Sequence, residues 1–173
     1  MNKAIIVLAS TFFVFFYTET YSQDKSKVAC TTVAYKQFDF WIGIWNVYDV
    51  KSKLIGTNTV VKMPNACTIQ ENWSSKTSTN KGTSYNYYDV TDNTWNQLWI
   101  DNAGSILKLK GKLIGKNMVL KSDLITGKKK SFYNQITFFN NSDGTVTQLW
   151  ELLDKDGIIF NEIFRGIYKR ITK

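Results

Sequence analysis

Hydrophobic and polar residues alternate along most of the chain, in short runs separated by turn residues at nearly even spacing. This alternation is typical of β-strands with one buried face, and the gaps between runs are too short for helices. The pattern predicts about ten strands, over residues 41–50, 55–63, 66–74, 83–90, 94–101, 105–112, 116–122, 131–140, 145–153 and 158–170. Such a series pairs as an antiparallel meander, which closes into a barrel or folds as a sandwich.

Three of the predicted turns share one layout. "DNAGS" (101–105), "NSDGT" (141–145) and "DKDGI" (154–158) each place glycine at the third loop position. A type I turn followed by a left-handed residue has this form, and glycine adopts the left-handed conformation without steric strain. The three hairpins therefore support the meander.

The first of these turns also sets the register of its two strands. With residues 102–104 as the loop, Trp99 lies opposite Leu107. Leucines alternate with lysines in 105–112, so the leucine face points inward. The inward face should therefore carry Trp95, Gln97 and Trp99 from one strand, and Ile69, Glu71 and Trp73 from 66–74. The faces of the last two strands stay open, as does the strand with Tyr85, Tyr87 and Tyr88.

The N-terminus has the layout of a secretory signal peptide. One lysine precedes an apolar run, Ala4–Phe16, that is too short to span a bilayer. We expect residues 1–22 to be removed, residues 23–33 to form a polar lead-in, and residues 34–173 to form one barrel domain in the periplasm or outside the cell. A retained N-terminal anchor is one alternative, and a lipid on Cys30 is another.

The chain contains two cysteines, Cys30 and Cys67, and export makes a disulfide between them possible. Thiols stay oxidised outside the cytoplasm, so we expect one disulfide between the lead-in and the third strand. Closing a loop of this size stabilises a fold by roughly 3 to 4 kcal/mol. The alternative is two unpaired buried thiols.

The chain contains no histidine, and its net charge is +8. Without histidine, the chain cannot form a Ser-His-Asp or Cys-His catalytic site, a His-rich zinc site or a histidine-ligated haem site. The basic surface is compatible with weak contact to anionic glycans or lipid head groups, or with ordinary solvation. Nucleic acid is not an expected partner of an exported protein, and we expect a monomer.

Gly43-Ile44-Trp45 resembles the Gly-X-Trp signature of the calycin superfamily, which includes lipocalins, fatty-acid-binding proteins and avidins. Longer segments look like exported bacterial calycin-like domains of the DUF1579 kind, whose function is undefined: "FDFWIGIWNVYD", "CTIQENW", "GTSYNYYD", "TWNQLWIDNAGS", "QLWE" and "GIYKR". The resemblance covers nearly all of the mature chain. It implies an all-β, single up-and-down barrel of lipocalin type with about ten strands.

In calycins this tryptophan plugs the base of the barrel, and an arginine from the last strand lies across its ring. The resemblance thus implies that Trp45 closes the barrel, with Arg165 or Arg170 above it, and Arg170 is favoured. A cation–π contact of this kind is worth roughly 0.5 to 2 kcal/mol. Gly43 would be bare because a ring or backbone passes close over it. Before the first strand, "VAYKQFDFW" predicts one helical turn with aromatic residues that cover an apolar opening.

Glu71 and Gln97 are the main candidates for chemistry, because a carboxyl and an amide inside an aromatic barrel need partners. Glu71 either braces the barrel, orients a ligand or acts as a general acid or base. Trp73, Trp95 and Trp99 form stacking walls or fill the interior. The pairs Asp154/Asp156 and Asp89/Asp92 lie in turns, where aspartate binds the backbone, so we expect no metal site.

Three functions remain open at this point. The preferred one is an exported barrel that binds a mostly apolar or aromatic small molecule through Glu71, Trp73, Gln97 and Trp99. The second is an isomerase, cyclase or lyase without metal or nucleotide that uses Glu71 as acid or base. The third is a solidly packed structural or interaction module. None of the three calls for a cofactor.

Overall fold

The computed structural model describes residues 30–64, 66–128 and 130–171. The predicted signal peptide and most of the polar lead-in lie outside the described residues. Two short 3₁₀-helices, η1 (Val33–Lys36) and η2 (Asp39–Trp41), precede the strands. The strands are β1 (Gly43–Tyr48), β2 (Leu54–Lys62), β3 (Thr68–Ser75), β4 (Lys81–Asp89), β5 (Thr94–Asp101), β6 (Ile106–Ile114), β7 (Asn117–Lys121), β8 (Ile125–Thr126), β9 (Ser131–Asn140), β10 (Val146–Leu153) and β11 (Ile159–Arg170).

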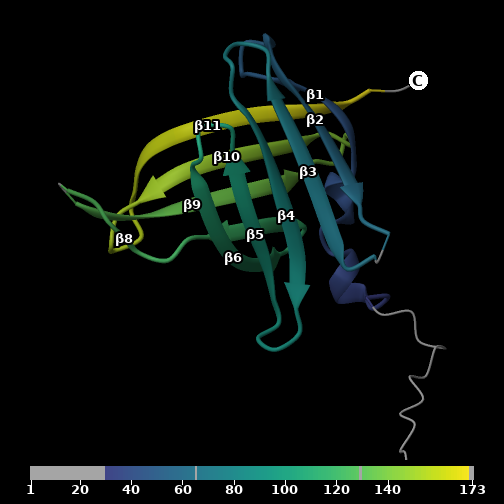
Figure 1. The fold of residues 1–173 in the computed structure, drawn as a ribbon, viewed down its shortest axis with the longest axis horizontal. Coiled ribbons are helices and arrows are strands. Elements are labelled where there is room, and N and C mark those ends of the chain that lie inside the picture. Colours follow the sequence, from purple (N-terminus) through teal and green to yellow (C-terminus); the bar gives the residue numbers. More distant parts are fainter. Residues whose placement is uncertain (1–29, 65, 129, 172–173) are drawn as a thin grey trace, which may run out of the picture.

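Ten of these strands form a closed antiparallel up-and-down barrel (Figure 1). Each strand pairs with the next, β7 pairs with β9, and β1 pairs with β11 to close the sheet. The two-residue strand β8, which was not predicted, pairs only with β9 and extends that edge. The all-β barrel is therefore confirmed. The predicted start of the first strand at residue 41 is wrong, because Trp41 belongs to η2.

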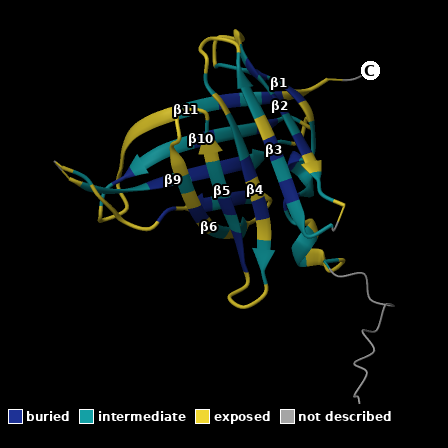
Figure 2. Ribbon diagram, in the orientation of Figure 1, coloured by how far each residue is buried: buried dark blue, intermediate teal, exposed yellow. Residues whose placement is uncertain are grey.

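The predicted hairpin turns are also confirmed. Gly104, Gly144 and Gly157 have φ values of 80°, 79° and 82°. In the first turn, the Gly104 N–H donates to the Asp101 carbonyl oxygen at 3.0 Å. Trp99 lies opposite Leu107, as the turn geometry required. Buried and exposed positions alternate along the strands (Figure 2), which reflects the period of two in the sequence.

The dense part of the core lies at the end of the barrel where β1 begins. The segment from η1 to η2 places Phe38 and Trp41 here, both fully buried. Their rings stack with centroids 5.0 Å apart, and the Phe38 ring meets Trp95 edge-on at 5.6 Å. Phe138 packs against the Trp41 ring with centroids 4.6 Å apart. Aromatic side chains thus fill this end of the barrel.

The seam between β1 and β11 brings Trp45 opposite Arg170. The Arg170 guanidinium lies over the Trp45 ring, 4.3 Å from its centroid. Arg170 Nη1 donates to the Ile42 carbonyl at 2.7 Å, and Nη2 donates to the Phe40 carbonyl at 3.2 Å. A Cβ on Gly43 would lie 2.4 Å from Arg170 Nη1. Gly43 therefore leaves room for the guanidinium.

The other candidate for this role, Arg165, lies elsewhere. It forms an ion pair with Glu162 on its own strand, with 2.6 Å between Arg165 Nη2 and Glu162 Oε2.

A disulfide joins Cys30 to Cys67, with Cα atoms 5.0 Å apart and a sequence separation of 37. It ties the segment before η1 to the start of β3, so the predicted bridge is present. This link holds the helical segment against the barrel end that it fills. Within the described residues, no helix has the length and apolar character needed to cross a membrane.

Removing the guanidinium tests how much the seam contributes to stability. We expect Arg170→Met to lower the free energy of unfolding by about 1 to 2 kcal/mol, because a cation–π contact and two charge-assisted hydrogen bonds are lost. The matched variant Arg165→Met removes only a surface ion pair and should change stability by less than about 0.5 kcal/mol. Urea unfolding followed by tryptophan fluorescence measures both. Equal effects of the two variants would contradict a special role for Arg170.

Candidate functional site

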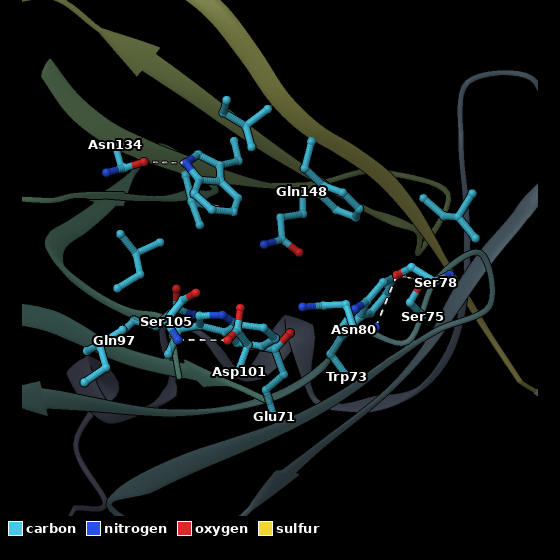
Figure 3. A pocket seen from close by; sticks show the side chains of 18 of the residues that line it. Glu71, Trp73, Ser75, Ser78, Asn80, Gln97, Asp101, Ser105, Asn134 and Gln148 are labelled. Atoms are coloured by element: carbon cyan, nitrogen blue, oxygen red, sulfur yellow. Dashed lines mark hydrogen bonds between the residues drawn. The ribbon is translucent and has the colours of Figure 1, made fainter. Parts of the chain in front are cut away.

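A cavity of about 680 Å³ occupies the half of the barrel opposite the packed aromatic end. Figure 3 shows some of the side chains that line it. Its walls come from the ends of β3, β5 and β10 and the starts of β2, β6, β9 and β11. Polar residues of the β3–β4 and β5–β6 turns stand at its mouth, among them Ser75, Ser78, Asn80, Asp101 and Ser105. This volume lies within the usual range of small-molecule sites.

Large aromatic side chains form the walls of the cavity. Trp73, Trp99, Trp150 and Phe164 all line it, and all are partly buried. The rings of Trp73 and Phe164 meet edge-on, with centroids 5.9 Å apart. The Trp150 Nε1–H donates to Asn134 Oδ1 at 2.9 Å. The indole of Trp150 is therefore held in one orientation, with an apolar surface left for contact.

Two glycines determine how the other indoles lie. A Cβ on Gly56 of β2 would come within 2.1 Å of the Trp73 ring, and a Cβ on Gly82 of β4 within 2.2 Å of the Trp99 ring. Each indole therefore packs against bare backbone of the neighbouring strand. This arrangement keeps both rings beside the wall, so they line the space without filling it.

A polar network crosses the barrel between the cavity and the packed aromatic end. The Glu71 carboxyl accepts hydrogen bonds from Asn58 Nδ2 and from the Ser84 hydroxyl, each at 2.6 Å. Asn86 Nδ2 donates to Ser84 Oγ at 2.9 Å, and Gln97 Nε2 donates to Asn86 Oδ1 at 2.8 Å. All five residues are buried. Of them, Glu71 and Gln97 line the cavity.

One backbone carbonyl fixes the direction of this network. Asn86 Nδ2 lies 3.2 Å from the Ile69 carbonyl oxygen, which can only accept. The other side-chain atom of Asn86 must then be the oxygen, so Gln97 donates to it through its amide nitrogen. The Ser84 hydroxyl accepts from Asn86, and its hydrogen is directed at Glu71. The hydrogen bonds therefore run in one direction, from Gln97 through Asn86 and Ser84 to the Glu71 carboxyl group.

A second branch of the network runs through Tyr168. Its hydroxyl donates to Gln148 Oε1 and lies 3.5 Å from Asn58 Nδ2. Burial, together with the Glu71 carboxyl, raises the pKa of the Tyr168 hydroxyl well above its ordinary value. Tyr168 therefore stays protonated and remains a donor. Asn58 Oδ1 is buried and has no hydrogen-bond partner among the described residues.

Burial dominates the ionisation of Glu71. Loss of solvent raises the pKa of its carboxyl from 4.5 to about 7, against the smaller opposing effects of the hydrogen bonds from Ser84 and Asn58. The group therefore changes its charge near neutral pH. That property suits either a general acid or base or a ligand-binding carboxylate.

The predicted site residues Glu71, Trp73, Gln97 and Trp99 all line this one cavity. Trp95 points inward but lies in the packed aromatic end, where its Nε1–H donates to Gln37 Oε1 at 3.1 Å. Tyr85 and Tyr87 are 41% and 43% exposed on the outer face. Tyr88 points inward beside Tyr35, away from the cavity.

Several residues of the site were not singled out from the sequence: Asn58, Ser84, Asn86, Asn134, Gln148, Trp150, Phe164 and Tyr168. Ser84 and Asn86 belong to the strand whose inward face was left open, because tyrosines occupy both faces. The residues on β10 and β11 come from strands in which both faces are mixed. Residues opposite each other on paired antiparallel strands point to the same face. The inward faces of β3 and β5 would therefore have placed Ser84 and Asn86 of β4 in the interior.

Asp154 and Asp89 bind the backbone of their turns, as predicted, whereas Asp92 and Asp156 form ion pairs with lysine side chains. Asp154 Oδ1 accepts from the N–H groups of Asp156 and Ile158, and Asp89 Oδ1 accepts from Thr91. Asp92 pairs with Lys110. Within residues 30–64, 66–128 and 130–171, no cluster of His, Cys, Asp or Glu side chains could hold a metal ion.

Comparison of the sequence with protein-family models and with curated proteins gives no significant match. The geometry of the cavity is therefore the basis for assigning a function.

The raised pKa of Glu71 makes stability depend on pH. The folded protein binds the proton more tightly than the unfolded chain, so this stabilisation is full below about pH 4.5 and is lost as the pH rises through about 7. We expect the free energy of unfolding to contain a decrease of roughly 3 kcal/mol over this range, which Glu71→Gln removes. Urea unfolding from pH 4.5 to pH 8 measures the slope.

Glu151→Gln is the matched control, because this β10 glutamate does not line the cavity. It should keep the wild-type pH dependence. A wild-type slope in Glu71→Gln would show that Glu71 does not titrate as described.

Proposed function

We propose that this protein is an exported barrel that binds a small, mostly apolar or aromatic molecule. The observation that carries the proposal is the cavity of about 680 Å³, lined by Trp73, Trp99 and Trp150 and by the polar groups of Glu71 and Gln97. Ligand sites of this size combine apolar walls with a few well-placed polar groups. A solidly packed module would have no need of glycines that keep two indoles beside the wall.

The calycin resemblance supports the same function. The closed up-and-down barrel and the contact between Arg170 and Trp45 are features that the resemblance implies. Barrels of this class enclose ligands when their strands leave an unfilled interior. The chain is therefore proposed to belong to the calycins, among the DUF1579-like domains.

The disulfide supports export. Structural disulfides persist in the periplasm and outside the cell, and the Cys30–Cys67 bridge fits such a compartment. The signal peptide at residues 1–22 is part of this proposal. The net charge of +8 adds a weak attraction to anionic surfaces.

A second candidate function is an enzyme in which Glu71 transfers protons. The observation that favours it is the pKa of about 7 at a carboxyl group that lines the cavity. Native mass spectrometry of protein purified from its own host would identify a co-purifying molecule. With that molecule as substrate, an enzyme would lose turnover in Glu71→Gln and keep binding, whereas a binding protein would show no turnover at all.

Titration with the neutral fluorescent dye Nile red tests the binding function. We expect saturable binding to the wild-type protein and about two- to tenfold weaker binding to Trp99→Ala, because an aromatic contact is worth about 0.5 to 1.5 kcal/mol. Ile100→Ala is the matched control, since Ile100 is the next residue on β5 and is 42% exposed. It should bind the dye like the wild type.

Absence of Nile red binding to the folded wild-type protein would contradict the proposal. Equal weakening in both variants would place the dye outside the cavity.

A further inference from the structure

Glu71 is a buried carboxyl group without a cationic partner among the described residues. Its two hydrogen-bond donors, Asn58 and Ser84, are both neutral. The ion pairs of the described residues join other groups, such as Lys62 with Asp39 and Arg165 with Glu162. A buried carboxylate is unfavourable unless an opposite charge approaches it. The site thus has negative charge available and no internal cation to balance it.

The groups that face Glu71 are known for each neighbouring element. Asn58 approaches from β2 and Ser84 from β4, and neither titrates. Tyr168 on β11 and Asp101 at the mouth are the other titratable groups that line the cavity. The raised pKa of the Tyr168 hydroxyl keeps it neutral, and Asp101 is a carboxyl group, so neither supplies a positive charge. Within the described residues, a positive charge at this position must therefore come from a bound molecule.

The hydrogen-bond directions leave further acceptors for that molecule. Gln97 uses its amide nitrogen for Asn86, and its Oε1 has no hydrogen-bond partner among the described residues. The Glu71 carboxylate can accept more hydrogen bonds than the two it receives, because its oxygens offer about four lone-pair sites. The polar end of the cavity therefore presents acceptors on β3 and β5 to a donor-rich group.

The walls suit a cation attached to an apolar body. The indoles of Trp73, Trp99 and Trp150 line the same cavity as Glu71, and Figure 3 shows Trp73 and Glu71 among the lining side chains. Aromatic rings attract a nearby cation through their negative faces, and they cover apolar surface. A carboxylate ligand would instead meet the charge of Glu71, and an alcohol would bring no charge to balance it.

We infer that the cavity selects a protonated organic amine with an apolar or aromatic body, whose N–H groups donate to Glu71 and Gln97. This inference rests on the proposed binding function and names its ligand class. The ammonium group supplies the cation that the described residues lack. The apolar body lies against the tryptophans of the wall.

Three probes with one common body test this selectivity: naphthylethylamine, naphthylethanol and naphthylacetate. Isothermal titration calorimetry at pH 8 should show the amine binding at least tenfold more tightly than the alcohol, and the acetate binding most weakly. The amine should also bind about tenfold more tightly at pH 8 than at pH 6, because Glu71 has to be ionised and the pKa of its carboxyl is about 7. The alcohol should show no such gain.

Two variants test whether the preference for the amine comes from Glu71 or from the overall charge of the protein. Glu71→Gln should bind amine and alcohol with equal affinity, and its amine binding should lose the pH dependence. Glu151→Gln, outside the cavity, should keep the wild-type preference. Circular dichroism spectra and urea unfolding midpoints like those of the wild type show that both variants are folded.

The failure of this inference can be distinguished from the failure of the binding function. A wild-type protein that binds Nile red but prefers the alcohol or the acetate, or binds no amine, would overturn the amine selectivity alone. A preference for the amine that persists in Glu71→Gln would also overturn it. A folded wild-type protein that binds neither Nile red nor any of the three probes would overturn both.

Discussion

Closure of the sheet between β1 and β11 is the constraint on which the rest of the structure depends. The other barrel pairings join neighbours along the meander, whereas this pairing joins the two ends of the barrel domain. Arg170 reaches carbonyl groups 128 and 130 residues away in sequence and covers the Trp45 ring. Bringing such distant segments together has an entropic cost, which hydrogen bonds to a charged group help to offset.

The sealed end allows the two halves of the barrel to differ. Aromatic packing around Phe38 and Trp41 excludes water from one half, so the other half can stay open without exposing the core. Glu71 lies at the boundary between the halves. It is shielded enough for burial to raise the pKa of its carboxyl, yet it still lines the cavity. The same placement thus makes the ionised carboxyl group costly for stability and leaves it accessible from the cavity.

The tryptophans serve two different purposes in one fold. Trp45 is fully buried beneath the Arg170 guanidinium, whereas Trp73 and Trp99 are partly buried and line the cavity. A glycine lies against each of these three tryptophans, but the missing side chain makes room for a different group in each case. Gly43 leaves space for Arg170, while Gly56 and Gly82 leave space for the indoles themselves. Each glycine therefore allows the close packing that holds its tryptophan in place.

The sequence by itself determined the ten barrel strands, apart from the start of the first, together with the hairpin turns and the inward faces of β3 and β5. These features are local, because side chains alternate with a period of two and glycine is needed where φ is positive. It therefore also placed Glu71, Trp73, Gln97 and Trp99 on interior faces. Only the tertiary structure decided that these residues share a cavity, and that Asn58, Ser84 and Tyr168 surround the carboxyl group. Those contacts depend on how the barrel curves and on which distant strands meet, and the alternation within a single strand carries no information about either.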